Sequence, residues 1–382
     1  MSAAAPASLA GTEDHPHARM VLGSALASGA PSHAYLFHGP PGTGKRTAAR
    51  ALAAELLADG DRDPASARRR VGSGAHPDLT WVRPTGAHVM RVDDVERPVI
   101  AAAGHTPFEA RRRVFVLERA DTMNDEVANR LLKTLEEPAA FVHLILLTDS
   151  LGRMLETVVS RCQLVRFDPL PPERIAAALE RDGVAGTRAA ACGRLALGNA
   201  ARARCLASDD GEALRVEIDA LVRSVLAGEV RSPGGDEPWR PLLERAEARR
   251  GVAEAAVREE AASRLELEPK GRERRALERE FDETAKRDGR RARTEVLELG
   301  LILAGLAFRD LACVAEGAQA AVLAVDRTPE LVPLARGRDA TRLRGALERC
   351  EDARQSLELN PTEELALTAL TIRLGRLVGP SG

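Results

Sequence analysis

Aromatic side chains are scarce in this 382-residue chain, at 3% of its composition, although hydrophobic residues of all kinds make up 44%. The cores must therefore be built mainly from Leu, Val, Ala and Ile. At roughly 100–200 residues per domain, the length predicts two or three domains.

Cysteines are few and follow no pattern. Their odd number and wide spacing exclude a disulfide framework, and no C-x-x-C pair indicates a zinc site. The first 20 residues lack the apolar run of a signal peptide, and no stretch of ~18 uncharged apolar residues predicts a membrane span. We therefore expect a soluble, cytoplasmic protein with no metal site and no membrane partner. The five cysteines are Cys162, Cys192, Cys205, Cys313 and Cys350.

Neither sign of charge dominates, because 55 Lys and Arg stand against 57 Asp and Glu, for a formal net charge of −2. This balance predicts no overall attraction to nucleic acid or membranes, although it leaves room for a local basic patch. Both signs are densest in Asp236–Arg293, where apolar positions are few. The clusters Arg274-Arg275 and Arg290-Arg291 could contact DNA. The interleaved acidic residues favour a solvated helix or a mobile segment instead.

Short apolar runs alternate with helical patterns as far as about Pro169. Such alternation predicts a parallel sheet with helices on both faces. After Leu170-Pro171-Pro172 the patterns are helical only, apart from a Pro/Gly turn at Arg231–Gly235. The predicted strands are Ala34–Phe37, Asp78–Val82, Arg113–Leu117, Val142–Thr148 and Gln163–Phe167, and the helices between them include Thr47–Leu57 and Val92–Ala103.

These patterns predict an α/β fold followed by an all-α part, in three domains. Residues 1–168 form the α/β domain, and residues 169–210 form a small helical domain. Residues 211–382 form a helical C-terminal domain that includes the charged segment at about 236–293.

A glycine-rich loop follows the first predicted strand and opens the next helix. It reads Gly39-Pro40-Pro41-Gly42-Thr43-Gly44-Lys45, the G-x-x-x-x-G-K of a phosphate loop in its strand-to-helix context. Backbone N–H groups of such a loop hold phosphate oxygens, and Lys45 would reach the β- and γ-phosphates. The next residue should be Ser or Thr, whose hydroxyl binds Mg²⁺. Here it is Arg46, and Thr47 is turned about 100° away along the helix.

The second half of an ATPase site also departs from its usual form. In P-loop ATPases of this kind an Asp-Glu pair follows a buried strand, one acid for Mg²⁺ and the other for the attacking water. Here Glu118-Arg119 follows Val114–Leu117. Glu118 could hold a metal weakly, but Arg119 stays protonated and cannot act as a base. We therefore expect that the loop could hold ATP or ADP without hydrolysing it. An active ATPase with unusual residues is the alternative.

Two segments carry a more specific signal. The helix after this strand reads Ala128-Asn129-Arg130-Leu131-Leu132-Lys133-Thr134-Leu135-Glu136-Glu137-Pro138, and Ser160-Arg161-Cys162 follows some 20 residues later. Together they resemble the AAA+ clamp-loader subunits of bacterial DNA polymerase III, a likeness that covers about the first 170 residues. Glu358–Pro361 resembles the end of that family's collar domain, whereas residues of about 210–300 match nothing.

The resemblance implies an AAA+ module, a helical lid and a collar that holds a ring together. The family has motor subunits (gamma/tau) with intact ATP motifs and usually a four-cysteine zinc module. It also has a non-motor type whose ATP motifs are often degenerate. Arg46, Arg119 and the cysteine-free segment Leu57–His76 favour the non-motor type, with no zinc.

The resemblance also implies roles for single residues. Arg161 would be an arginine finger, supplied in trans to the ATP site of a neighbouring motor subunit, where it would neutralise charge on the γ-phosphate. Thr148 matches the sensor-1 position, and Arg202 matches the sensor-2 arginine. A strand-end Thr with a local hydrogen bond and a solvated helix Arg are equal alternatives. Glu136-Glu137 are expected to be structural, because neighbouring helix positions point ~100° apart.

The chain is therefore expected to be a stator of the clamp loader. Its expected partners are the gamma/tau motor subunits, a delta subunit, the sliding clamp and, through the complex, primed DNA. The alternatives are a catalytically active gamma/tau-type motor and another AAA+ machine, such as a helicase loader or remodeller.

Overall fold

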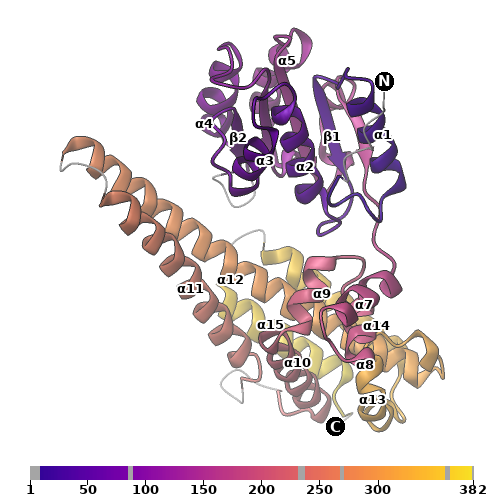
Figure 1. Ribbon diagram of the computed structural model, residues 1–382. Coiled ribbons are helices and arrows are strands. Elements are labelled where there is room, and N and C mark those ends of the chain that lie inside the picture. Colours follow the sequence, from indigo (N-terminus) through magenta and orange to yellow (C-terminus); the bar gives the residue numbers. More distant parts are fainter. Residues whose placement is uncertain (1–8, 85–88, 231–236, 267–270, 358–361, 381–382) are drawn as a thin grey trace. The chain divides into compact units, whose positions relative to one another are not determined.

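The computed structural model describes residues 9–84, 89–230, 237–266, 271–357 and 362–380. It divides into two compact units, shown in Figure 1, which are described separately below. Unit 1 comprises residues 1–171 with 197–201, and unit 2 comprises residues 172–196 and 202–382. The predicted small helical domain is thus shared between the two units. The predicted turn at 231–235 and the collar-like segment 358–361 lie outside the described residues.

Unit 1 is built on one five-stranded parallel sheet in the order β2-β3-β4-β1-β5, which confirms the predicted fold class. The register pairs Leu36 with Leu146 and His38 with Thr148, so the carboxyl ends of β1 and β4 meet at one edge. The strands are β1 (Ala34–His38), β2 (Leu79–Val82), β3 (Arg113–Leu117), β4 (Val142–Thr148) and β5 (Gln163–Arg166).

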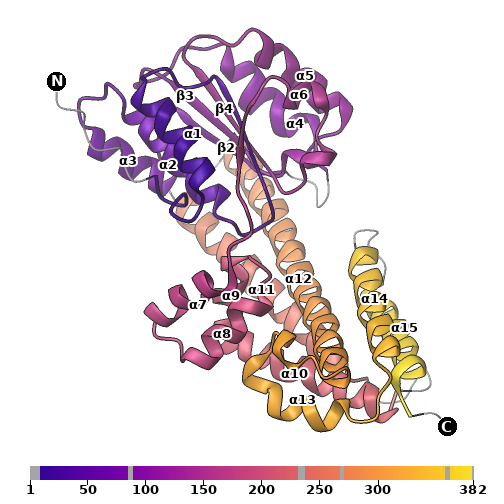
Figure 2. The ribbon, with the colours of Figure 1, turned by 90° about the vertical axis from the view of Figure 1, so that its right-hand side faces the viewer.

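Helices cover both faces of the sheet, as Figure 2 shows. Because strand side chains alternate between faces, Leu36 and Leu146 belong to the core under α4–α6, while Phe37 and Leu147 belong to the core under α1–α3. The helical elements are α1 (Pro16–Ala27), α2 (Lys45–Ala58), α3 (Pro64–Ser73), α4 (Val92–Val95), η1 (Glu96–Ala101), η2 (Ala120–Thr122), α5 (Asp125–Glu136), η3 (Leu151–Arg153) and α6 (Glu156–Val159).

One predicted helix of unit 1 is irregular. Val92–Ala103 forms α4 and then the π-helical turn η1, which contains Pro98. Proline has no N–H to donate to the carbonyl four residues earlier, so it disturbs an α-helix at this point. Its wider turn still buries Val99 against the sheet.

In the residues that the structure describes, unit 2 consists of helices. The charged segment forms the long helix α11 and the first half of α12, which pack against each other as a hairpin (Figure 1). No helix among the described residues is both long and apolar enough to cross a membrane. The elements are α7 (Pro172–Arg181), α8 (Gly186–Leu195), α9 (Ala200–Ala207), α10 (Asp209–Ala227), α11 (Arg240–Leu265), α12 (Arg272–Ala315), η4 (Gln319–Ala321), η5 (Val325–Arg327), α13 (Thr328–Ala335), α14 (Ala340–Ser356) and α15 (Glu363–Val378).

Candidate functional site

The phosphate loop joins β1 to α2 and depends on glycine at two close approaches. Gly39 has φ +144°, and a Cβ there would lie 1.9 Å from the carbonyl oxygen of Phe167. Gly42 has φ +75°, and a Cβ there would lie 1.7 Å from Oδ1 of Asn199. Side chains other than hydrogen are strained at such φ values as well as blocked by these atoms. The glycines of the motif are therefore required by the packing of the loop.

Lys45 turns back onto its own loop. Its ammonium donates to the carbonyl oxygens of Gly39 and Pro40, and it forms an ion pair of 2.7 Å with Oδ1 of Asp149. Burial lowers the pKa of Lys45, and the Asp149 carboxylate acts in the opposite direction. The positive charge meant for phosphate is thus balanced inside the chain by Asp149, which sequence reasoning missed.

Thr43 and Thr47 occupy different surroundings in this loop. Thr43 is buried, and its hydroxyl donates to the carbonyl oxygen of Pro40 at 2.9 Å. Thr47 is exposed on the first turn of α2, as is Pro41 on the loop.

Arg46 and Glu118, two of the three unusual residues of the site, contact each other. Arg46 Nε lies 3.0 Å from Glu118 Oε1 in an ion pair. The same oxygen accepts hydrogen bonds from Trp81 Nε1 at 2.5 Å and from Arg83 Nε at 3.3 Å. The Glu118 side chain is only 6% exposed, whereas the side chain of Arg46 is 53% exposed. The two departures from the ATPase pattern therefore compensate each other, because each neutralises the charge of the other.

This arrangement does not fit a magnesium ion. A cation placed between the loop and Glu118 would face the guanidinium groups of Arg46 and Arg83, and like charges at such distances repel. The expectation that Glu118 could hold a metal weakly thus finds no support in its surroundings. Among the described residues, no cluster of three or more His, Cys, Asp or Glu side chains could hold a metal ion.

Arg119 and Thr148 lie at the same edge of the sheet, Arg119 shortly after β3 and Thr148 at the end of β4. Arg119 adopts a left-handed backbone with φ +53° and precedes η2. Thr148 is buried, and its hydroxyl lies 3.1 Å from both Asp121 Oδ1 and the carbonyl oxygen of Ser150. These hydrogen bonds lie at the end of β4 and fix the backbone next to Asp149. The signal for Asp149 was its place directly after β4, at the edge where β1 and β4 end together.

Arg161 lies apart from this cluster, on the turn after α6. Its Nη2 forms an ion pair of 2.6 Å with Glu136 Oε1 at the end of α5, and its Nη1 donates to the Thr157 carbonyl oxygen at 2.9 Å. The side chains of Arg161 and Glu136 are 35% and 48% exposed. Burial raises the pKa of the neighbouring Cys162 thiol to about 12, and this side chain packs against the core. The turn thus packs the Cys162 side chain against the core and leaves the Arg161 side chain partly exposed at the surface.

Arg202 belongs to unit 2, on α9. Its Nη1 donates to the carbonyl oxygen of Ala196, and burial lowers the pKa of its guanidinium. The role of Arg202 as a sensor stays a prediction.

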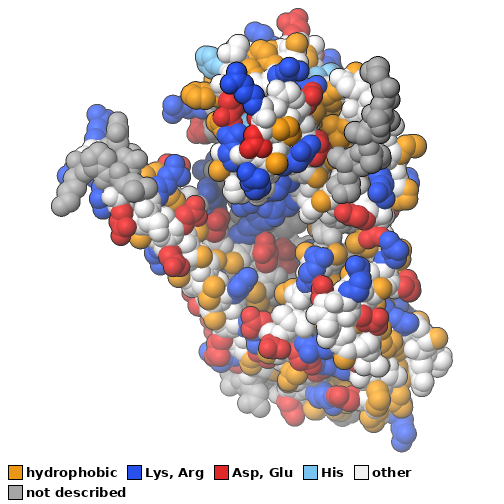
Figure 3. Space-filling model, in the orientation of Figure 1, with side chains coloured by type: hydrophobic (Ala, Val, Ile, Leu, Met, Phe, Trp, Pro, Cys, Tyr) orange, Lys and Arg blue, Asp and Glu red, His pale blue; other side chains and the backbone are white. Residues whose placement is uncertain are grey.

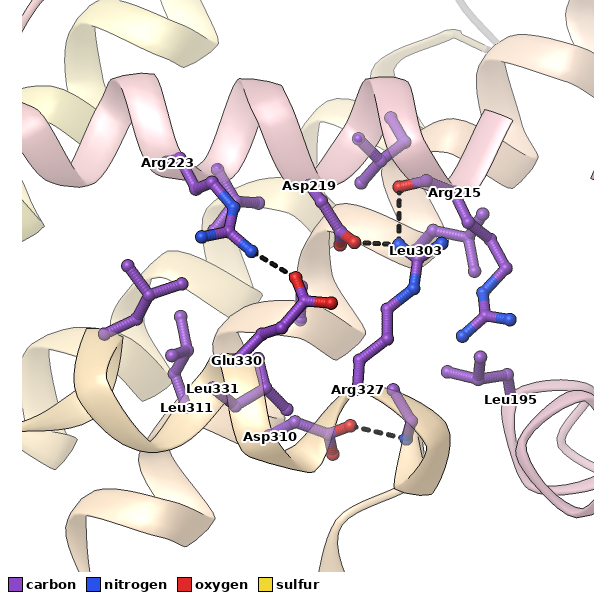
Figure 4. Close-up of a pocket in the computed structure, with 15 residues that line it drawn as sticks. Leu195, Arg215, Asp219, Arg223, Leu303, Asp310, Leu311, Arg327, Glu330 and Leu331 are labelled. Carbon is purple, nitrogen blue, oxygen red and sulfur yellow. Dashed lines mark hydrogen bonds and ion pairs between the residues drawn. The ribbon is translucent and has the colours of Figure 1, made fainter. Parts of the chain in front are cut away.

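Unit 2 contains a pocket of its own, shown in Figure 4. Leu195, Leu303 and Leu311 are among the apolar residues of its wall. Its charged rim is paired: Arg223 with Glu330, Arg327 with Asp219, and Arg215 with Asp326, the last pair at 2.8 Å. These pairs join α10 to η5 and α13. Each of these cations already has a carboxylate partner. The ion pairs therefore connect the helices around the pocket, and such a charged rim is not typical of a catalytic site.

Comparison with known proteins finds similarity in unit 1. Residues 14–171 match the family model described as "DNA polymerase III, delta subunit". DNA polymerase III subunit delta' of Bacillus subtilis is 38% identical over 148 residues, which are 38% of this chain and 44% of that protein. Over these residues the N-terminal unit is thus similar to delta-type subunits of DNA polymerase III. The motifs Leu131–Pro138 and Ser160-Arg161-Cys162 lie within the residues that match this family model.

Other DNA polymerase III proteins match at lower identity. Subunit gamma/tau of Mycobacterium tuberculosis is 34% identical over 181 residues, or 46% of this chain and 31% of that protein. A solved structure, a gamma subunit-related protein of Thermotoga maritima, aligns over 94% of this chain and 99% of its own, with 16% identity and a TM-score of 0.47. The sequence match thus spans less than half the length of these clamp-loader relatives.

Proposed function

We propose that this chain is a delta-prime-like subunit of the DNA polymerase III clamp loader, and that it acts as a stator without hydrolysing ATP. Its partners in the ring would be gamma/tau-type motor subunits and a delta subunit. The ring would open the sliding clamp and place it on primed DNA in the cytoplasm. The observation that carries the proposal is the Arg46–Glu118 ion pair inside a clamp-loader AAA+ module.

The proposed lack of turnover follows from charge. Phosphoryl transfer by P-loop enzymes needs Mg²⁺ to neutralise the phosphates and a residue to orient the attacking water. In this chain Arg46 takes the position of the metal-binding hydroxyl, and Arg119 takes the position of the water-orienting acid. Backbone N–H groups of Gly39–Lys45 remain suited to phosphate oxygens. ATP or ADP bound there would have to compete with Asp149 for Lys45, and would stay intact.

Arg161 is proposed to act on a neighbour's ATP. It is partly exposed, and its ion-pair partner Glu136 is more exposed still. Exposed ion pairs contribute only about 0–1 kcal/mol, so the guanidinium can exchange partners at little cost. A γ-phosphate carries more negative charge than one carboxylate and would attract Arg161 away from Glu136. The gamma/tau-type motor is the weaker candidate, because such a motor would need its own metal site.

The test is a ring reconstituted with motor and delta subunits and the Arg161→Ala variant. An arginine finger contributes ~10³–10⁵ in rate, so ATP hydrolysis should be lost at the one motor site that this subunit completes, and clamp loading should fall with it. Assembly, followed by size-exclusion chromatography, should not change. Arg153→Ala, at an exposed arginine of η3, is the matched control. Equal hydrolysis by the Arg161→Ala and control rings would discard the finger.

A further inference from the structure

The α11–α12 hairpin carries charges of both signs, and Figure 3 shows them mixed on the side that it presents. Their distribution around α12 is uneven. At about 100° per residue, Arg272, Arg275, Arg279, Asp282, Glu283, Lys286 and Arg290 fall within one arc of about 100°. All seven are exposed. We call these seven residues the basic face; five cations less two acids leave it a formal charge of +3.

The ion pairs of α12 separate this face from the rest of the helix. Arg274 pairs with Glu278 at 3.1 Å and Arg291 pairs with Glu295 at 2.9 Å, both off the basic face. Lys286 pairs with Asp282 at 2.7 Å on the face itself. Among the described residues, no carboxylate forms an ion pair with Arg272, Arg275, Arg279 or Arg290. Their positive charge is therefore available to a ligand.

We propose that the basic face binds the phosphate backbone of a nucleic acid. From Arg272 to Arg290 it extends about 27 Å along the helix axis, at 1.5 Å per residue, so it suits a row of phosphates and not a single one. Arginine guanidinium groups pair well with phosphate oxygens.

The composition of the face argues against other occupants. Its seven residues include no apolar side chain, and interfaces between proteins rely on apolar anchors at their centre. Binding at a membrane surface also needs an apolar face beside the charged one. A nucleic-acid backbone needs charge alone, and contacts to it carry no sequence preference. The net charge of the whole chain, −2, would not by itself attract DNA.

The experiment measures binding of the full-length chain, without ring partners, to a fluorescein-labelled duplex and to a labelled single strand across a salt series. Arg275→Gln/Arg279→Gln removes two charges from the basic face, and Arg274→Gln/Arg291→Gln removes two from other faces of the same helix. Gln keeps the helix propensity of Arg. Because the chain is tested alone, the outcome does not depend on the clamp-loader role.

The first variant should weaken binding at least about fivefold and reduce the slope of log affinity against log salt by about 1–2, since each lost phosphate contact accounts for ~0.9 on a duplex and ~0.7 on a single strand. The matched variant should stay within about twofold of the parent chain. Whichever probe binds more tightly identifies the preferred strand form. Equal losses in both variants, no binding by the parent chain, or equally tight binding of polyglutamate would overturn the proposal. Thermal melting by circular dichroism confirms that both variants are folded.

Discussion

Two arginine–glutamate pairs in unit 1 have opposite characters. Arg46 pairs with Glu118, whose side chain is 6% exposed and accepts from Trp81 and Arg83 as well. Arg161 pairs with Glu136, whose side chain is 48% exposed. A buried carboxylate needs its cations, whereas an exposed pair contributes little. The first pair is therefore a fixed part of the fold, and the second can open for a ligand.

The largest expected effect comes from removing both cations at the buried pair. Arg46→Ala/Arg83→Ala leaves the Glu118 carboxylate buried with only the Trp81 N–H, and stranding a buried charge costs about 3–5 kcal/mol. We expect the free energy of unfolding at pH 7 to fall by that amount, as measured by urea denaturation.

A third substitution provides the control. Adding Glu118→Gln to the double variant removes the buried charge itself, so most of the lost free energy of unfolding should be recovered. No recovery would mean that the Glu118 carboxylate is not the cause.

A middle-sized effect is expected at Asp149. Asp149→Asn removes the charge that competes with phosphate for Lys45, and we expect binding of ADP or pyrophosphate to tighten about tenfold, or ~1.4 kcal/mol. Isothermal titration calorimetry measures this directly, with Asp168→Asn as a control carboxylate that pairs with Arg166. Unchanged or weaker affinity would show that the Lys45–Asp149 pair does not compete with phosphate.

The smallest effect is expected at the exposed pair. Glu136→Gln should lower the free energy of unfolding by no more than about 1 kcal/mol, because exposed pairs contribute about 0–1 kcal/mol. Glu137→Gln is the matched control at the next position, and both are measured by thermal melting. A loss of several kcal/mol for Glu136→Gln alone would make this pair a fixed element of the fold and would weaken Arg161 as a mobile finger.

The strands of the sheet were predicted well, because an apolar run or a loop motif is contained in one short segment of the sequence. Strand-to-helix context located Gly39–Lys45, and apolar runs located the strands of the sheet. Pairing between Arg46 and Glu118 could not be predicted, because the contact joins α2 to the end of β3 across the sheet edge. Asp149 was missed for the same reason: its role comes from the register of β1 with β4.

In the α11–α12 hairpin, the linear sequence does not show how the charges are arranged around the helix. Along the chain, Arg274-Arg275 and Arg290-Arg291 look like two equivalent clusters among acidic residues. On the helix, Arg274 and Arg291 reach carboxylates four residues ahead, while Arg275 and Arg290 lie on the basic face. Linear charge density hides such a separation, because neighbouring helical residues point about 100° apart. The segment is helical as one of the two sequence interpretations expected, but its charges are not evenly mixed.

The proposed function depends most on the inference that this chain does not hydrolyse ATP by itself. The direct measurement is ATP hydrolysis by the purified chain with Mg²⁺, compared with a variant in which Arg46→Thr, Glu118→Asp and Arg119→Glu replace the unusual residues together. We predict no turnover above background for the parent chain at any Mg²⁺ concentration. Steady, Mg²⁺-dependent hydrolysis by the parent chain would contradict the account.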